Sequence, residues 1–323
     1  MPRPRILVTR RWPDAVERRL CALFDTTLIA DDHRLSADEL RAALRDHDAV
    51  LPTVSDRLAA GVLAVEAPRA RILANYGVGY SHIDVDAARE RGLVVTNTPG
   101  VLTDCTADLA LTLMLMVARR AGEGERELRA GRWTGWRPTH LVGTRLSGKT
   151  LGIIGMGRIG IAVARRAQHG FGMQVVFFNR SPVAAEALAG LQATQLERVE
   201  DALAQADFVS LHCPGGGANR HLIDAARLAV MKPGAFLINT ARGDVVDEAA
   251  LAAALQHGRL AGAGLDVFEA EPQVRPGLLA LENVVLLPHL GSATRETREA
   301  MGMRVVDNLV AFFDGRRPPD QVS

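Results

Sequence analysis

The chain of 323 residues lacks the features that mark several large classes of protein. Its three cysteines, Cys21, Cys105 and Cys213, are widely spaced and odd in number. They predict thiols in a reducing compartment and no disulfide framework. Formal net charge is only +1, and there are two tyrosines and three tryptophans. Neither a basic field nor a base-stacking surface for nucleic acid is therefore expected.

Long apolar runs are also missing. The most apolar stretch, 109–118, is too short to cross a bilayer, which takes about 20 apolar residues. The first residues, MPRPRILVTRRWPD, include no apolar segment of signal-peptide length. The sequence contains no HExxH, CxxC or paired-carboxylate metal motif. We therefore expect a cytoplasmic protein that has no membrane partner, no nucleic-acid partner and no metal.

The sequence does contain two series of short apolar segments that alternate with helical patterns. Such alternation predicts parallel sheets with helices on both faces. Ser36 and Glu39 match a capping box at a helix start. Strands are predicted at 5–9, 27–30, 49–53, 71–75 and 93–97 in the first series, and at 150–155, 174–179, 208–212, 235–239, 262–266 and 284–287 in the second.

A long helical pattern, 294–313, follows the second series, so we infer that the chain crosses between two domains twice. The prediction is an α/β protein with two Rossmann/flavodoxin-like domains, the second inserted into the first, and an active site in the cleft. Residues 1–100 plus 290–323 would bind the substrate, and 101–289 would bind NAD(P). The helix at 103–120 is apolar on nearly all sides, which is typical of a buried helix or a subunit interface.

Gly155, Gly157 and Gly160 form a GxGxxG motif between the strand TLGIIG and the helix IGIAVARRA. In this context the first glycine permits a tight turn, the second lets the backbone approach a pyrophosphate, and the third lets the helix pack closely on the strand. The helix start adds amide donors and a partial positive charge. The motif predicts a dinucleotide site.

The next strand should end in an acidic residue that holds the ribose of NAD, but it ends in Asn179, Arg180 and Ser181. A neutral amide, a fixed cation and a hydroxyl suit a 2′-phosphate better than a carboxylate would. We therefore expect NADPH to be preferred, with NADH possible. The alternative is that Arg180 is a solvated loop residue or stacks on adenine.

Three later motifs end predicted strands at the edge where α/β sheets bind ligands. Arg242 follows AFLIN and could hold a carboxylate or polarise a carbonyl. Asp266 and Glu271 lie in GLDVFEAEP, and His289 lies in LLPHLGS. Each has a plain structural alternative, as a surface arginine, a turn residue or a hydrogen-bonded histidine.

Taken together, NTPGVLTDCTADLAL, LGIIGMGRIG, INTARGDVVDEAAL, AGLDVFEAEP and LLPHLGSAT resemble the D-isomer-specific 2-hydroxyacid dehydrogenases over nearly the whole chain. GRWTGWRP and NRS are most similar to the glyoxylate/hydroxypyruvate reductases of that family. The resemblance implies that Arg242 binds the substrate carboxylate and 2-oxo oxygen and that His289 is the proton donor. Glu271, rather than Glu269, would pair with His289 and favour the protonated imidazole.

The resemblance also implies cofactor and substrate contacts along the chain. The substrate would meet Val54, the amides of Val78 and Gly79, and Trp136 from a partner subunit, unless Trp136 is a core residue of a dimer arm. The cofactor would meet Gly155, Gly157, Arg158, Ile159 and Gly160 at the pyrophosphate, Asn179, Arg180 and Ser181 at the ribose, Asp266, Thr240 and Ala241 near the carboxamide, and Thr106, Cys213 and Pro214 along its length.

The expected function is NADPH-dependent reduction of glyoxylate or hydroxypyruvate to glycolate or D-glycerate by a homodimer. A reductase of 2-ketogluconate or another 2-oxo acid is an alternative within the family. A dinucleotide-sensing binding module of corepressor type is an alternative from a different class. The segment Gly215–Gly217 departs from the family pattern, and its three glycines predict a more mobile loop.

Overall fold

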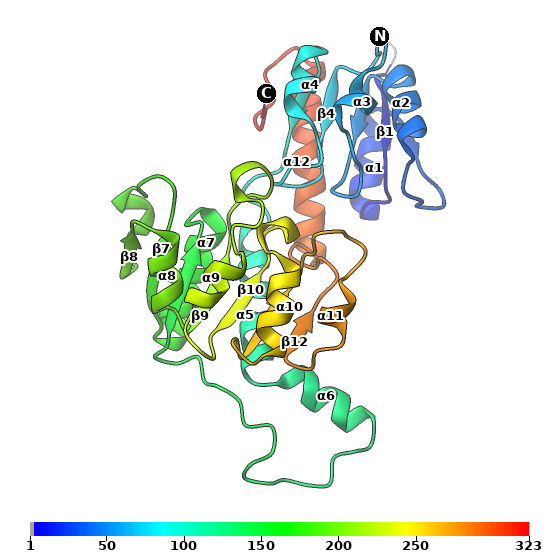
Figure 1. The fold of residues 1–323 in the computed structure, drawn as a ribbon. Coiled ribbons are helices and arrows are strands. Elements are labelled where there is room, and N and C mark those ends of the chain that lie inside the picture. The colour runs from blue at the N-terminus through cyan, green and yellow to red at the C-terminus, as the bar shows by residue number, and fades with distance from the viewer. Residues whose placement is uncertain (1–2, 323) are drawn as a thin grey trace. The chain divides into compact units, whose positions relative to one another are not determined.

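The computed structural model describes residues 3–322, and they form two compact units. The first unit ends at Leu102 and resumes at Ala293, and the second spans Thr103–Ser292. Figure 1 shows a parallel sheet in each unit. Within the described part of the chain, no helix has the length and apolarity that a membrane crossing requires.

The sheet of the first unit has the strand order β2-β1-β3-β4-β5, and every pair in it is parallel. Its helices cover both faces. Helices α2, α3 and α4 supply the core of one face, and α1 and α12 supply the other. The elements are β1 (Arg5–Val8), α1 (Asp14–Leu23), β2 (Asp25–Leu28), α2 (Ala37–Asp46), β3 (Ala49–Leu51), α3 (Ala60–Leu63), β4 (Ile72–Ala74), α4 (Val85–Glu90), β5 (Val94–Thr96) and α12 (Arg295–Phe313).

Local sequence explains where helix α2 begins. The capping box is present, because Ser36 Oγ accepts from the Glu39 amide and the Glu39 carboxylate accepts from the Ser36 amide.

Helix α12 packs on α1 at Gly302, where a Cβ would lie 2.5 Å from the Val16 side chain. The C-terminal helix therefore completes the core of the first unit.

The second unit is built on the order β12-β11-β10-β9-β6-β7-β8, again parallel throughout. Helices α8–α11 cover one face, and α5 and α7 cover the other. The elements are α5 (Thr103–Ala118), α6 (Ala121–Arg129), β6 (Thr150–Ile154), α7 (Arg158–Phe171), β7 (Gln174–Phe178), β8 (Ala193–Leu196), α8 (Val199–Gln205), β9 (Phe208–Leu211), α9 (Ala225–Val230), β10 (Phe236–Asn239), α10 (Glu248–Gln256), β11 (Gly262–Leu265), α11 (Pro276–Leu279) and β12 (Val284–Leu286), with short 3-10 turns at Ala185–Leu188, Gly217–Asn219 and Gly243–Val245.

The apolar helix α5 is a core element of the second unit. It packs on β11 through two glycines, since a Cβ at Gly262 would meet Val117 at 2.6 Å and one at Gly264 would meet Leu113 at 2.9 Å. Eight of its residues are buried within its own unit, as the first interpretation expects, whereas Leu115 is 37% exposed.

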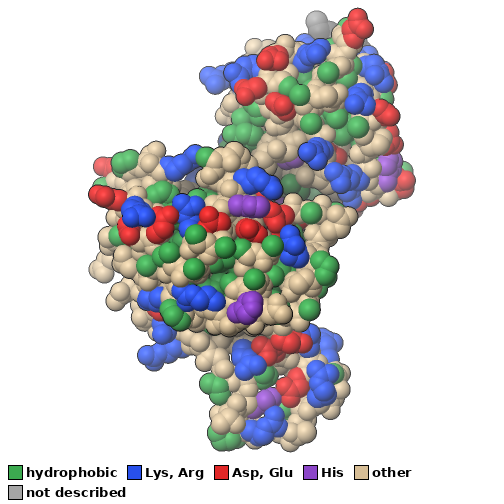
Figure 2. All heavy atoms as spheres, viewed as in Figure 1, with side chains coloured by type: hydrophobic (Ala, Val, Ile, Leu, Met, Phe, Trp, Pro, Cys, Tyr) green, Lys and Arg blue, Asp and Glu red, His purple; other side chains and the backbone are tan. Residues whose placement is uncertain are grey.

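An arm leaves the second unit after α5. Helix α6 has no buried residue, and the segment from its end to β6 has no regular structure and projects from the rest of the unit (Figure 1). The arm is held at its return, where the Thr144 amide donates to the Ala118 carbonyl over 2.8 Å. Elsewhere on the surface, acidic and basic side chains are interspersed across the face shown in Figure 2.

The sequence patterns missed helix α6, and they missed or misplaced three further elements. Strand β8 was not predicted, because it is a half-exposed edge strand whose Thr194 and Gln195 carry no apolar signal. Strand β2 lies two residues before the predicted 27–30. The apolar spacing over 55–65 predicts a helix, but only α3 at Ala60–Leu63 is helical, because the Asp56 carboxylate binds the Thr53 amide in the preceding turn and does not cap a helix.

Candidate active site

The GxGxxG motif forms the turn between β6 and α7. Gly155 has φ +97°, and a Cβ there would lie 2.7 Å from the Cys213 amide nitrogen. A Cβ at Gly160 would lie 2.4 Å from the Gly155 carbonyl oxygen, so helix and strand could not approach as they do. Gly157 is the N-cap residue of α7, and the space around its Cα is open. Arg158 and Ile159 contribute first-turn amides, which have no partner inside the helix. This cradle fits a pyrophosphate.

The end of β7 is tied to the glycine turn by a neutral side chain. Asn179 accepts from the Met156 amide at 3.3 Å and donates to the Ser181 carbonyl at 2.9 Å. Arg180 and Ser181 are exposed beside it. The position that a ribose-binding carboxylate would occupy therefore holds an amide, with a cation next to it.

Two side chains that follow strands β10 and β9 bear on how a ligand could bind at this edge of the sheet. Among residues 3–322, none forms a hydrogen bond with the buried hydroxyl of Thr240, a polar atom that a bound ligand could satisfy. Burial raises the pKa of the Cys213 thiol to about 11, although Arg180 opposes the shift. Cys213 is therefore a neutral thiol at physiological pH and is not an activated nucleophile.

Arg242 follows β10, and its guanidinium donates to the Ala241 carbonyl over 2.6 Å. Burial lowers the pKa of Arg242, and the nearby carboxylates of Glu271 and Asp244 oppose the shift. An arginine remains protonated at neutral pH after such a shift. The second unit thus presents a desolvated cation at the carboxyl edge of its sheet.

Glu271 and His289 form a pair, with His289 Nδ1 2.9 Å from Glu271 Oε2. Burial would raise the pKa of Glu271, but the hydrogen bond and charge of His289, the Phe268 amide and the charge of Arg242 together lower it below its usual range. The carboxylate therefore stays ionised and fixes Nδ1 of the ring. Glu269 is directed elsewhere and pairs with His221 at 2.5 Å.

The loop that carries His289 is held by Asp266. His289 has φ +56°, a left-handed conformation that is unusual for a non-glycine residue. The Asp266 carboxylate accepts from the amides of Leu290 at 2.6 Å and Gly291 at 2.8 Å, and Thr106 Oγ1 donates to the Gly291 carbonyl at 2.9 Å. Burial raises the pKa of Asp266 despite these donors. Asp266 and Thr106 thus position the His289 loop, a role that the sequence did not reveal.

The glycine-rich segment after Pro214 packs on Arg242. A Cβ at Gly215 would lie 2.4 Å from Asp244 Oδ1 and 2.8 Å from Arg242 Cβ. The Gly216 amide donates to Asp244 Oδ2 at 2.7 Å. The glycines therefore permit close contact with Arg242 and Asp244, which their expected mobility alone did not suggest.

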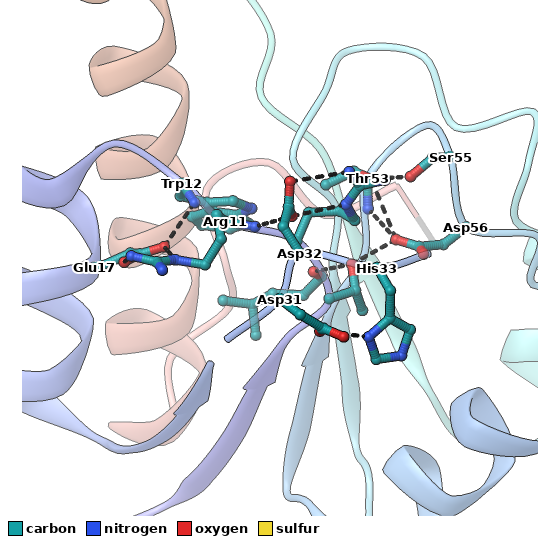
Figure 3. Close-up of polar contacts among 12 residues, drawn as sticks. Arg11, Trp12, Glu17, Asp31, Asp32, His33, Thr53, Ser55 and Asp56 are labelled. Atoms are coloured by element: carbon teal, nitrogen blue, oxygen red, sulfur yellow. Dashed lines mark hydrogen bonds and ion pairs between the residues drawn. The ribbon is translucent and has the colours of Figure 1, made fainter. Parts of the chain in front are cut away.

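In the first unit, Val54 lies in the loop after β3 and is 45% exposed. The fully buried Asp56 holds this loop: its Oδ2 accepts from the Thr53 amide at 2.7 Å and from Thr9 Oγ1 at 2.5 Å. Figure 3 shows the Thr53, Ser55 and Asp56 contacts of this loop. The backbone that carries Val54 is thus fixed from the protein side while the valine faces solvent.

Val78 and Gly79 lie in the turn after β4, and their carbonyls are bound. Asn97 Nδ2 donates to the Val78 carbonyl at 2.9 Å, and Asn75 Nδ2 donates to the Gly79 carbonyl at 3.1 Å. Trp136 lies in the arm and is 82% exposed, so it is not a core residue of its own chain. Within the described residues, no group of three or more His, Cys, Asp or Glu side chains is placed to hold a metal ion.

Comparison with known proteins agrees with this geometry. Residues 111–291 match the family described as D-isomer specific 2-hydroxyacid dehydrogenase, NAD binding domain. The chain is 44% identical to a glyoxylate reductase of Thermococcus litoralis over 99% of this chain and 97% of that protein. A solved NADPH-dependent glyoxylate/hydroxypyruvate reductase from Sinorhizobium meliloti, in complex with NADP and malonate, is 40% identical, with a TM-score of 0.88 over 99% of this chain and 97% of that one. A D-mandelate dehydrogenase of Rhodotorula graminis is 32% identical, with a TM-score of 0.88 over 100% and 98%.

The chain belongs to the D-isomer-specific 2-hydroxyacid dehydrogenase family. It is an NAD(P)-dependent oxidoreductase that acts on a 2-oxo acid and the corresponding 2-hydroxy acid. The binding module of corepressor type is therefore not the function that its relatives support.

Proposed function

We propose that this enzyme reduces glyoxylate and hydroxypyruvate and that it prefers NADPH to NADH. The neutral Asn179 and the cationic Arg180 at the end of β7 carry the proposal for the cofactor. The named relatives support the proposal for the substrate, since glyoxylate reductases resemble this chain over nearly its full length.

The proposed chemistry divides among three side chains of the second unit. Arg242 binds the carboxylate and polarises the 2-oxo group. His289 donates a proton to the developing alkoxide through Nε2, because Nδ1 is bonded to Glu271. Glu271, ionised and with a side chain that is 33% exposed, keeps the imidazolium oriented and stabilises its charge. The nicotinamide supplies the hydride when the cofactor is bound.

The remaining assignments complete the proposed site. In the first unit, Val54 contacts the substrate and the amides of Val78 and Gly79 bind its carboxylate. The contacts proposed for the cofactor are the backbone of Gly155, Gly157, Arg158, Ile159 and Gly160 at the pyrophosphate, Asn179, Arg180 and Ser181 at the 2′-phosphate, Thr240, Ala241 and Asp266 at the carboxamide, and Thr106, Cys213 and Pro214 along the cofactor.

Initial rates with NADPH and NADH, at saturating glyoxylate and hydroxypyruvate, test this function. We expect faster turnover with NADPH, and we expect Arg180→Asp to lower the NADPH/NADH ratio of kcat/KM by about tenfold or more, because a carboxylate repels the 2′-phosphate. Arg165→Asp on the outer side of α7 is the control. An unchanged ratio in Arg180→Asp would refute the cofactor assignment, and turnover only with a bulkier acid such as 2-ketogluconate would refute the substrate assignment.

We also propose that the enzyme is a homodimer, with Trp136 reaching the active site of the partner subunit. The support is a set of exposed apolar side chains on the arm, since Trp136, Leu128, Trp133 and Val142 are all more than half exposed. Trp136→Ala should weaken self-association by about tenfold or more in sedimentation velocity at decreasing concentration, since aromatic anchors dominate interfaces. Leu279→Ala removes an apolar side chain that is 62% exposed on α11 and should leave association unchanged. A monomeric wild type would exclude the arm as a dimer interface.

A further inference from the structure

In the turn Gly77–Tyr80, two backbone carbonyls accept hydrogen bonds from buried groups of the first unit. Asn75 Nδ2 donates to both of them, Gly77 at 3.0 Å and Gly79 at 3.1 Å. The Gly77 carbonyl also accepts from the Thr98 amide at 3.1 Å. Asn75 and Thr98 are fully buried, whereas the turn is partly exposed. These two carbonyls therefore point into the unit.

The direction of the carbonyls fixes the direction of the amides. In a trans peptide the N–H of one residue points opposite to the C=O of the residue before it. The N–H groups of Val78 and Tyr80 therefore point away from Asn75, and that of Gly79 points away from Asn97, which holds the Val78 carbonyl at 2.9 Å. Among residues 3–322, none accepts a hydrogen bond from these three amides. A set of backbone amides that face outward is a receptor for an anion.

His82 sets the orientation of the Asn75 amide. Its Nε2 lies 3.0 Å from Asn75 Oδ1. Since Nδ2 of Asn75 donates to two carbonyls, its oxygen must face His82, and His82 must donate through Nε2. Exchange of the amide oxygen and nitrogen would place an acceptor against two carbonyl oxygens and a donor against the histidine.

We propose that Asn75, oriented by His82, is a positioning residue for the substrate carboxylate, and that the Tyr80 amide is a third donor to that carboxylate beside those of Val78 and Gly79. This inference rests on the proposed function, because it takes a 2-oxo acid as the ligand of the turn. Asn75 itself touches neither the substrate nor the cofactor in this proposal. It acts by holding two peptide planes in the orientation that exposes their N–H groups.

Steady-state kinetics of Asn75→Ala with glyoxylate and NADPH, and inhibition by malonate as a carboxylate probe, test the proposal. We expect the KM for glyoxylate and the Ki of malonate to rise together by about 10- to 100-fold, which is the usual effect of weakened hydrogen bonds to a charged group. The KM for NADPH should change less than about twofold, and kcat should fall less than the affinity. KM and Ki do not depend on how much of the variant folds. A uniform loss that changes both KM values, or a loss of kcat alone, would indicate a merely structural role and overturn the proposal.

Further variants separate the steps. His82→Leu leaves Asn75 in place and should raise the glyoxylate KM, but by less than Asn75→Ala does. His82→Gln retains a hydrogen-bond donor, so its glyoxylate KM should be closer to the wild-type value. Asn283→Ala is the matched control, because Asn283 also donates from its amide to a backbone carbonyl but lies in the second unit. If the wild type turns over glyoxylate and Asn75→Ala keeps its KM, only this inference fails. If the wild type reduces no 2-oxo acid, the proposed function fails and this inference falls with it.

Discussion

Replacing His289 by glutamine is expected to lower kcat for 2-oxo acid reduction by about 10²- to 10⁴-fold, the usual contribution of a positioned general acid. Glutamine can still donate one hydrogen bond to the Glu271 carboxylate, but its amide is too weak an acid to protonate the alkoxide. Binding of NADPH, measured by fluorescence titration, should be unchanged, because the glycine turn and the end of β7 are separate from this side chain.

The pH profile gives a second measurement on the same pair. The pKa of Glu271 is held below its usual range, so its carboxylate is ionised across the neutral region. Because a general acid acts only in its protonated form, the wild-type rate of reduction should decrease as the pH rises, and His289→Gln should abolish that decrease. His169→Gln, on the exposed side of α7, is the matched control and should behave as wild type. Full activity in His289→Gln would exclude the proposed proton donor.

Replacing Arg242 by lysine is expected to lower kcat/KM for the 2-oxo acid by roughly 100-fold although the charge is retained. A guanidinium offers planar, paired donors that match a carboxylate, whereas an ammonium is a point donor on a flexible stem. The surroundings increase the penalty, since Arg242 is desolvated and Gly215 packs directly against its Cβ. The shorter lysine head would leave this buried space without the second donor.

Arg165→Lys makes the same exchange on the surface of α7 and should change neither kcat nor the KM for the 2-oxo acid by more than about twofold. The comparison is made at saturating NADPH, so that the 2-oxo acid is the only limiting ligand. A wild-type kcat/KM in Arg242→Lys would show that no bidentate contact forms, and the carboxylate would then have to be bound by other donors.

Much of the fold was accessible from periodicity. The apolar runs that form β6, β9 and β10 are buried at nearly every position. Such continuous apolar segments predict the strands of a parallel sheet from the sequence alone. The edge strand β8 was not accessible, because half of its residues face solvent and carry polar side chains. Its pairing with β7 is fixed by tertiary structure rather than by its own pattern.

The candidate site divides in the same way. Residues that follow strands, such as Arg242 and His289, could be proposed as site residues from the sequence, because the carboxyl edge of a parallel sheet is where ligands bind. The side chains that orient them could not: Asp266 reaches amides that lie 24 and 25 positions further along the chain. Asn75 had one usable signal, since it is a polar residue that directly follows the apolar strand β4. A single sequence does not reveal which backbone carbonyls such a residue will hold.

The loop that carries Val54 has a consequence for how this enzyme could change its substrate range. Its backbone is fixed from below by the Asp56 carboxylate, while the valine side chain itself is nearly half exposed and is not part of the core. The conformation of the loop backbone therefore does not depend on which side chain stands at position 54. A lineage, or a laboratory library, can exchange the side chain at 54 with little risk to folding. Because we propose that Val54 contacts the substrate, this position is a natural starting point for evolving acceptance of larger 2-oxo acids.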